Sequence, residues 1–549
     1  MNSTLLQNLG RGGLGMFFLL FVCYILSNNR RGINWKLVIM GVLAQIMFAM
    51  GVLHTTAFGQ PVFWMLFALV VGYTIVRKFL KYQKKEAPVS YDAKDLGLSV
   101  LWQGLFIVGL IIANRIFGEW TDLVMTISAV SILVIAFKMG SRHAELLKWN
   151  ILFSAAVLVI CVFTKVCPPD LFRVLLQSAS SVFVKLINIS HRGTEFLFGR
   201  LADDKQSWAY VFAIQVLPNI IFFAALSAIL FYMGILQKIV FVFAYLLNKL
   251  FISGAESMST AANIFLGQTE APLMIRPYLE KMTRSEILCI MIGGMANTAG
   301  SVLAAYVGML GGSDLAQQNY FALHMLSQSI MSAPAAIVCS KMLFPQTHGE
   351  VISKDLTVPK EKLGDNFLDA LSMGTTDGLK LAANVGAMLI VFTAMMWVAN
   401  GLMYWVGDLT NINIKIATAT GGRYDSLSLD LILGYIFSPV AWLIGVDKVD
   451  MLSIGQLLGV KTIINEFQAY IVLGDMKAHN LIKEPKSLLI ATYALCGFAN
   501  FASIGIQIGG ISQLAPNQRR NLTELGVKAL IGGTIACLMC GCIAGALYG

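Results

Sequence analysis

Long apolar segments without charged residues alternate with short polar loops along the whole chain. A membrane-spanning helix needs about 20 consecutive, mainly apolar residues. Residues 38–76 contain no Lys, Arg, Asp or Glu, so they can hold two such helices with a turn at 54–61. By this criterion the sequence predicts about twelve spans. They lie at 12–28, 38–76 (a pair), 96–114, 123–137, 149–164, 206–237, 287–313, 315–340, 381–407, 487–518 and 529–549.

The composition supports a helical membrane protein with many spans. Hydrophobic residues make up 57% of the chain and charged residues 13%, whereas soluble proteins carry about 25% charged residues. The net charge of +10 comes from basic loops that fall on one side if the N-terminus is outside. This arrangement predicts that both termini are outside, provided that 251–280 and 430–475 do not cross the membrane fully. It also explains the basic charge without a nucleic-acid partner.

Two parts of the chain combine an interrupted apolar segment with a helix that is itself broken by polar residues. The first pair is 254–273 followed by 291–306, and the second is 457–470 followed by 493–510. Irregular backbone is tolerated within a membrane only where it lines a cavity or is buried in protein. Paired broken segments in two halves indicate a transporter built from inverted repeats, with its site near the middle of the membrane.

Two acidic residues lie in these interrupted segments, Glu270 and Glu466. A carboxylate within the membrane costs about 2.5–3.5 kcal/mol on insertion scales, and such residues usually mark ion or substrate pathways. We therefore favour a functional role for both. The structural alternatives are a carboxylate that caps a neighbouring helix and, for Glu466, an ion pair with Lys461.

Neutral polar residues accompany the carboxylates. Asn263, Asn297 and Thr298 offer the oxygen ligands that hard cations prefer, but helix–helix hydrogen bonding explains them equally well. Asn500 and Ser503 are three residues apart and would share one helix face. There they would suit a neutral ligand with several hydroxyl groups, or form a polar seam between helices.

The sequence predicts neither an enzyme nor a resident cofactor. It contains no HExxH, GxSxG or P-loop motif. Cys537, Cys540 and Cys542 lie in the last apolar segment without a nearby His or carboxylate. We interpret them as small core residues and not as metal ligands.

Several long motifs resemble, in order, the concentrative nucleoside transporter family. They include VLPNIIFFAAL (216–226), ANIFLGQTEAPLMIRPYL (262–279), AGSVLAAYVG (299–308), NVGAMLIVF (384–392), ILGYIFSPVAWLIGV (432–446), LLGVKTIINEFQAY (457–470) and YALCGFANFASIGIQIGG (493–510). The resemblance implies an all-α membrane protein with an inverted-repeat core of about eight spans, two re-entrant hairpins of opposite orientation and elevator-like alternating access. It also implies a homotrimer.

The expected organisation follows from this resemblance, with an added segment that has no counterpart in it. The parts are 1–60, the first two core spans; 61–170, an insertion of about four spans; 171–250, an interfacial helix and a core span; 251–345, the first hairpin and the following core spans; 346–425, a cytoplasmic loop, an amphipathic helix and a core span; and 426–549, the second hairpin and the last two core spans.

The resemblance also implies the residues of the site. Contacts to the nucleobase from the first hairpin and its broken helix would come from Gly267, Gln268, Thr269, Glu270 and Val302. Contacts to the base and ribose from the second half would come from Glu466, Phe498, Asn500 and Ser503. A sodium ion would be bound, partly through backbone carbonyls, by Asn263, Leu266, Asn297, Thr298 and Ala299.

The expected function is a sodium-driven symporter that imports nucleosides such as uridine, cytidine and adenosine. Its partners would be nucleosides, Na⁺ and the lipid bilayer, and its location the plasma membrane, a bacterial inner membrane. Proton coupling stays open because the Asn297–Thr298 pair departs from the hydroxyl-rich versions of the family's sodium site. A nucleoside channel or facilitator and a nucleoside-gated sensor are further alternatives.

Overall fold

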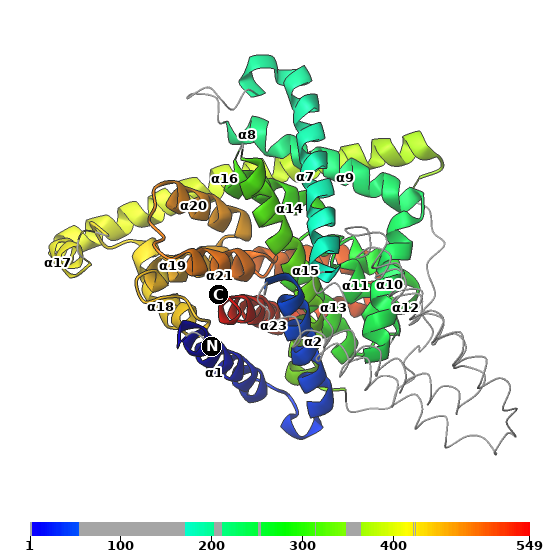
Figure 1. Cartoon of the computed structure of the whole chain (residues 1–549), viewed down its shortest axis with the longest axis horizontal. Coiled ribbons are helices and arrows are strands. Elements are labelled where there is room, and N and C mark those ends of the chain that lie inside the picture. Colours follow the sequence, from blue (N-terminus) through cyan, green and yellow to red (C-terminus); the bar gives the residue numbers. More distant parts are fainter. Residues whose placement is uncertain are drawn as a thin grey trace, which may run out of the picture. The chain divides into compact units, whose positions relative to one another are not determined.

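The computed structural model describes residues 3–53, 171–202, 211–250, 254–312, 314–346, 364–420, 422 and 424–548. Every regular element in these ranges is a helix (Figure 1), so the predicted all-α fold is confirmed. Met1–Ala49 and Leu176–Gly549 form one compact unit, and Met50–Leu175 form a second. The extra spans predicted within 61–170 lie outside the described residues.

Two halves of the first unit repeat one order of elements. Each half contains two helices, the short segments of a hairpin, a broken helix and a long final helix. In the first half these are α9 (Leu217–Tyr232), α10 (Ile235–Leu250), α11 (Gly254–Ala262) with η4 (Ala271–Ile275) and α12 (Arg276–Leu279), α13 (Arg284–Ala296) with α14 (Gly300–Gly311), and α15 (Leu315–Leu343). In the second half they are α16 (Phe367–Leu409), α18 (Leu429–Leu443), α19 (Met451–Ile463) with α20 (Glu466–Ala478), α21 (Pro485–Leu495) with α22 (Phe501–Leu514), and α23 (Arg519–Ala546).

The remaining elements precede the first half, except for α17 and η5, which lie within the second half. They are α1 (Ser3–Ile25), η1 (Arg30–Gly32), α2 (Trp35–Leu53), α7 (Leu171–Phe198), η3 (Gly199–Ala202), α8 (Phe212–Gln215), α17 (Ile412–Ala419) and η5 (Pro516–Gln518).

The described ranges contain seven helical segments that are long and apolar enough to cross a membrane. They are Gln7–Ile25, Trp35–Leu53, Ala213–Tyr232, Arg284–Gly311, Leu315–Leu343, Phe367–Leu409 and Pro516–Ala546. The eighth predicted core span, 487–518, consists of two shorter helices, α21 and α22. The helices of the second hairpin are also short: α19 and α20 have 13 residues each. At 1.5 Å per residue such a helix is about 20 Å long, too short for a hydrocarbon core of about 30 Å.

One helix of each broken pair, α13 and α22, begins at a polar side-chain cap. α13 begins with a capping box in which Thr283 and Glu286 satisfy each other's backbone N–H groups, and its C-cap Asn297 is extended. In the second half, the N-cap of α22 is Asn500, whose side chain accepts a hydrogen bond from the Ser503 N–H at 2.9 Å. The prediction that Asn500 lies on a helix face with Ser503 was therefore wrong, because Asn500 precedes the helix. The two residues are nevertheless neighbours.

Glycines allow α16 to pack closely against α9. A Cβ atom on Gly374 would lie 2.9 Å from Ala225 Cα, and one on Gly378 would lie 2.8 Å from Ile221 Cα. The two glycines are four residues apart and so lie on one face of α16. Small residues at this spacing let helix backbones approach closely in membranes, where van der Waals packing drives association.

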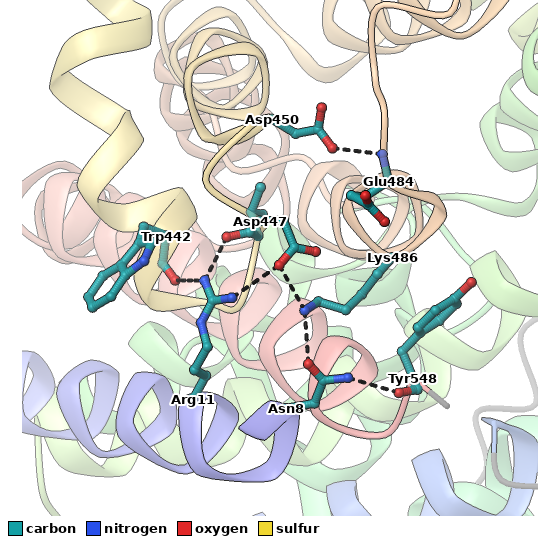
Figure 2. Close-up of polar contacts among 9 residues, drawn as sticks. Asn8, Arg11, Trp442, Asp447, Asp450, Glu484, Lys486 and Tyr548 are labelled. Carbon is teal, nitrogen blue, oxygen red and sulfur yellow. Dashed lines mark hydrogen bonds and ion pairs between the residues drawn. The ribbon is translucent and has the colours of Figure 1, made fainter. Parts of the chain in front are cut away.

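A polar network ties α1 to the segment that precedes the second hairpin (Figure 2). The Arg11 guanidinium donates to the backbone carbonyls of Trp442 and Val446, at 3.2 and 2.7 Å, and to Asp447 Oδ1 at 3.2 Å. The last carbonyls of a helix lack partners within it, and a basic side chain there also interacts favourably with the helix dipole. Arg11 thus caps the C-terminal end of α18 from a different helix.

The same network reaches α21 and the end of the chain. Lys486 Nζ donates to Asp447 Oδ1 at 3.3 Å and to Asn8 Oδ1 at 2.9 Å, and Asn8 donates to the Tyr548 carbonyl at 3.1 Å (Figure 2). Asp450 is fully buried and accepts hydrogen bonds from the backbone N–H groups of Lys483 and Glu484. The segments on either side of the second hairpin are therefore held together.

Candidate functional site

The broken helices of the two halves meet at their breaks. The Phe498 N–H donates to the Asn297 carbonyl at 3.3 Å, and Thr298 Oγ1 lies 3.5 Å from Cys496 Sγ. The first hairpin rests on the same place, because the Gly300 N–H donates to the Phe265 carbonyl at 3.1 Å. Residues that are some 200 positions apart in sequence are thereby brought to one locus, as the paired broken segments predicted.

A chain of hydrogen bonds crosses this locus from one hairpin to the other. Gln268 Nε2 donates to Ser503 Oγ at 3.2 Å, and Asn500 accepts from the backbone of Ser503. Asn500 Nδ2 in turn donates to Glu466 Oε2 at 2.7 Å, and the Tyr306 hydroxyl donates to Glu466 Oε1 at 3.2 Å. All five side chains are buried. We call these residues the polar relay.

Lys461 bonds to the backbone of α21 and not to Glu466, the partner that the sequence suggested. Its Nζ donates to the Ala494 carbonyl at 2.8 Å, and it forms no ion pair with Glu466. Glu466 is instead held by two neutral donors, Tyr306 and Asn500. Glu466 therefore has no direct ion pair with Lys461, and its hydrogen-bond partners are neutral.

Gln268 belongs to the motif GQTE (267–270), and the other residues of this motif lie outside the polar relay. Glu270 is exposed, and its carboxylate accepts a hydrogen bond from the Gly267 N–H at 3.2 Å without capping η4. Thr269 packs against α22, since a Cβ atom on Gly510 would lie 2.7 Å from Thr269 Cγ2. Glu270 is thus an exposed residue whose carboxylate turns back to its own loop, whereas the Thr269 methyl group contacts α22.

Two apolar residues border the polar relay. Val302 is buried on α14, one turn before Tyr306. Phe498 lies in the second break and is partly exposed, so its ring has a surface available for stacking.

The predicted cation ligands lie between the first hairpin and the first break. Asn263 is 1% exposed, and neither polar atom of its side chain has a hydrogen-bond partner among the described residues. A Cβ atom on Gly293 would lie 3.2 Å from Asn263 Nδ2, which places this amide against the last turn of α13. Leu266, just after Asn263, and Ala299, just after Thr298, are also buried. Their backbone carbonyls are further oxygen atoms of the kind that a cation binds.

Asn297 is partly satisfied. Its Oδ1 accepts a hydrogen bond from Ser332 Oγ at 2.6 Å, whereas its Nδ2 has no partner in the described part of the chain. Leaving a buried polar group unpaired costs about 1–3 kcal/mol, so such groups normally bind water or a ligand. The C-terminal end of α13 also carries the negative end of the helix dipole. The Nδ2 group is a donor and would meet water or a ligand acceptor, whereas the negative end of α13 favours a cation.

Sequence reasoning missed three residues of the locus. Tyr306 follows Val302 by four residues and Gln507 follows Ser503 by four, so helical spacing could have found both. Gln507 is fully buried, donates to the Met291 carbonyl at 3.0 Å and leaves its Oε1 unpaired among the described residues. Ser332 belongs to a Ser-rich stretch of α15 and carried no distinctive signal.

A buried ion pair anchors the first hairpin. Lys341 on α15 donates to Glu256 on α11, and its Nζ also donates to Ser285 Oγ at 3.1 Å. Ser285 belongs to α13, so this one ammonium group connects three elements that surround the predicted cation ligands.

Comparison with known proteins agrees with this arrangement. Three family models match in order: the Na⁺ dependent nucleoside transporter N-terminus at 14–82, the nucleoside recognition family at 213–313 and the Na⁺ dependent nucleoside transporter C-terminus at 324–545. An uncharacterized transporter of Bacillus subtilis, YutK, is 36% identical over 425 residues, which cover 76% of this chain and 98% of YutK. The chain belongs to the concentrative nucleoside transporter family. The resemblance noted in its motifs is confirmed.

Further relatives of this concentrative nucleoside transporter include animal proteins. The sodium/nucleoside cotransporter 1 of Rattus norvegicus is 34% identical over 440 residues, covering 77% of this chain and 64% of the relative. Solute carrier family 28 member 3 of Eptatretus stoutii is 39% identical, and the match spans half of its length and 65% of this chain.

Solved structures of one relative, CNTnw, share the fold. An inward-facing, substrate-bound state matches with a TM-score of 0.68 at 30% identity, covering 98% of this chain and 99% of CNTnw. An outward-facing state of a doubly substituted form matches with the same TM-score at 28% identity, covering 100% and 98%. Nucleoside transport by alternating access, a fold with several membrane spans and a named Na⁺ dependence therefore characterise the family.

Proposed function

We propose that this protein imports nucleosides such as uridine, cytidine and adenosine by symport with sodium, through an elevator-like movement. The observation that supports this most directly is the polar relay, which joins the two hairpins beside buried amides that lack protein partners. We further propose that it works as a homotrimer in a bacterial inner membrane with both termini outside, and that 61–170 form an inserted group of spans.

The chemistry of the polar relay suits a neutral ligand with hydroxyl groups. An ionised carboxylate has about four acceptor positions, and Tyr306 and Asn500 use two of those on Glu466. Ribose hydroxyls can donate to the remaining positions. We assign the ribose and part of the base to Glu466, Phe498, Asn500 and Ser503.

The first half would recognise the nucleobase. Base edges present both donors and acceptors, and Gln268 Oε1 is an acceptor without a partner among the described residues. The carboxylate of Glu270, which accepts a hydrogen bond from the Gly267 N–H, would be a second acceptor for base N–H groups. We assign the base contacts to Gly267, Gln268, Thr269, Glu270 and Val302.

The cation would bind beside this site. We assign it to Asn263, Leu266, Asn297, Thr298 and Ala299, which offer amide, hydroxyl and carbonyl oxygens at the negative end of α13. A cation entering down the membrane potential releases about 2.3 kcal/mol per charge per 100 mV. At about 1.4 kcal/mol per tenfold change, that drives roughly fortyfold accumulation before any sodium concentration gradient is added.

Uptake of labelled nucleosides into proteoliposomes tests the proposal. Na⁺ and H⁺ gradients are imposed separately, with a panel of purine and pyrimidine nucleosides. Concentrative uptake driven by Na⁺ is expected. Uptake driven only by H⁺ would assign the protein to proton coupling, and equilibration without accumulation would show a channel or facilitator.

A further inference from the structure

Lys461 is a buried basic residue in the second hairpin that forms no direct ion pair with the described residues. It lies near the end of α19 and is 1% exposed. Its Nζ donates to the Ala494 carbonyl at 2.8 Å. In the described part of the chain, no carboxylate oxygen lies within 4.0 Å of this nitrogen. A buried charge is costly unless it is compensated, so its location requires an explanation.

The Lys461 ammonium group lies at the C-terminal end of α21, the first part of the second broken helix. Ala494 is the penultimate residue of α21, directly before the second break. The last carbonyls of a helix have no partners within it and carry about half a negative charge. Transporters with broken helices use such ends to coordinate cations. The Lys461 ammonium group occupies this position as a cation that belongs to the chain.

The first half presents the same pair of elements without a basic side chain at the corresponding carbonyls. There α11 and the residues after it pack against the end of α13, and the side chain at this place is the unpartnered amide of Asn263. The carbonyl of Ala296, the last residue of α13, accepts from the neutral Gln328 Nε2 at 3.1 Å and from Cys537 Sγ at 3.5 Å. The two halves thus differ in charge where their architecture is equivalent.

We propose that the Lys461 ammonium group is the fixed cation of the second half, so that only the first half takes up a coupling ion and a single charge moves with each nucleoside. This inference rests on the proposed function, because it assigns the mobile cation to the end of α13. It explains why a lysine lies at the end of α21, whereas an amide without a partner among the described residues, that of Asn263, lies at the end of α13.

Counting charges per nucleoside tests this inference. The ratio is obtained from the reversal potential of nucleoside flux in proteoliposomes with imposed ion and voltage gradients. Lys461→Gln and Lys461→Met remove the charge, and Lys461→Arg retains it. Lys477→Gln is the matched control: Lys477 lies in the same hairpin and donates to the Leu310 carbonyl at 2.6 Å, near the far end of α14, but it is only partly buried.

The expected ratio is a single charge per nucleoside for the wild type, Lys461→Arg and Lys477→Gln. A neutral Lys461 variant should move one additional cation, and its dependence on sodium concentration should change from hyperbolic to sigmoidal. A folded neutral variant with wild-type ratio and sodium dependence would overturn the inference.

If the neutral variants do not fold, the number of charges per nucleoside in the wild type still tests the inference. Two charges per nucleoside in the wild type would refute the inference and leave the symporter proposal intact. Absence of gradient-driven accumulation in the wild type would instead refute the proposed function.

Discussion

Replacing Glu466 by Gln tests the centre of the polar relay. The substitution keeps the size of the side chain but replaces a charged acceptor by an amide. In the structure, Glu466 accepts hydrogen bonds from Asn500 at 2.7 Å and Tyr306 at 3.2 Å. An amide at this place presents one oxygen and an NH₂ group, so it cannot accept from both neighbours and also from a ribose hydroxyl without leaving a donor unpaired.

The expected loss follows from the number of bonds affected. One hydrogen bond to a charged group contributes about 1.5–3 kcal/mol. At about 1.4 kcal/mol per tenfold change, Glu466→Gln should weaken nucleoside binding by about tenfold to about a hundredfold. Tyr306→Phe removes only one donor and should have a smaller effect. Because both residues act on one carboxylate group, the double variant should fall short of the sum of the two losses.

Equilibrium binding of labelled uridine to purified protein, together with uptake into proteoliposomes, measures both effects. Glu280→Gln is the matched control, since Glu280 is exposed and its carboxylate makes no ion pair with the described residues. Unchanged uridine affinity in well-folded Glu466→Gln protein would exclude Glu466 from the substrate site and refute the assignment of the polar relay.

Three further variants test the surroundings of the site. Asn263→Leu removes an unpaired amide from the predicted cation site, so the sodium concentration for half-maximal uptake should rise by about tenfold or more, a loss of about 1.4 kcal/mol; an unchanged sodium titration would contradict the assignment. Lys341→Met leaves Glu256 without its buried ion-pair partner and should lower stability by about 3–5 kcal/mol, measured as the loss of monodisperse protein on heating, and adding Glu256→Met should recover part of it. Gly374→Leu would place a side chain against the α9 backbone and should cost about 1–3 kcal/mol in the same assay, whereas Gly401→Leu on the same helix has open space and should be neutral.

Much of the candidate site was predictable because it follows the pattern of polar residues in apolar segments. Gln268, Glu466, Asn500 and Ser503 were identified from the sequence, and the structure joins them by hydrogen bonds. The hydrogen-bond partners of those side chains were harder to predict from the sequence. Tyr306 sits in an ordinary apolar helix, and only the approach of α14 to α20 reveals that it donates to Glu466.

Errors in the prediction came from assuming that neighbours in sequence interact. Lys461 lies five positions before Glu466, yet a turn between α19 and α20 separates them, and Lys461 points to α21 instead. Asn500 was placed on a helix that begins one residue later. In both cases a helix boundary, which side-chain periodicity defines poorly, decided the contact.

The sequence by itself determined the membrane class, the helical fold, the interrupted segments and the family. Each of these depends on local hydrophobicity or on contiguous motifs, and the long apolar segments leave few other ways to satisfy backbone polar groups in lipid. Only the tertiary structure decided which polar atoms are paired and which are left without partners. The contrast between Asn263 at the end of α13 and Lys461 at the end of α21 arises from packing between helices far apart in the chain, and no local pattern records it.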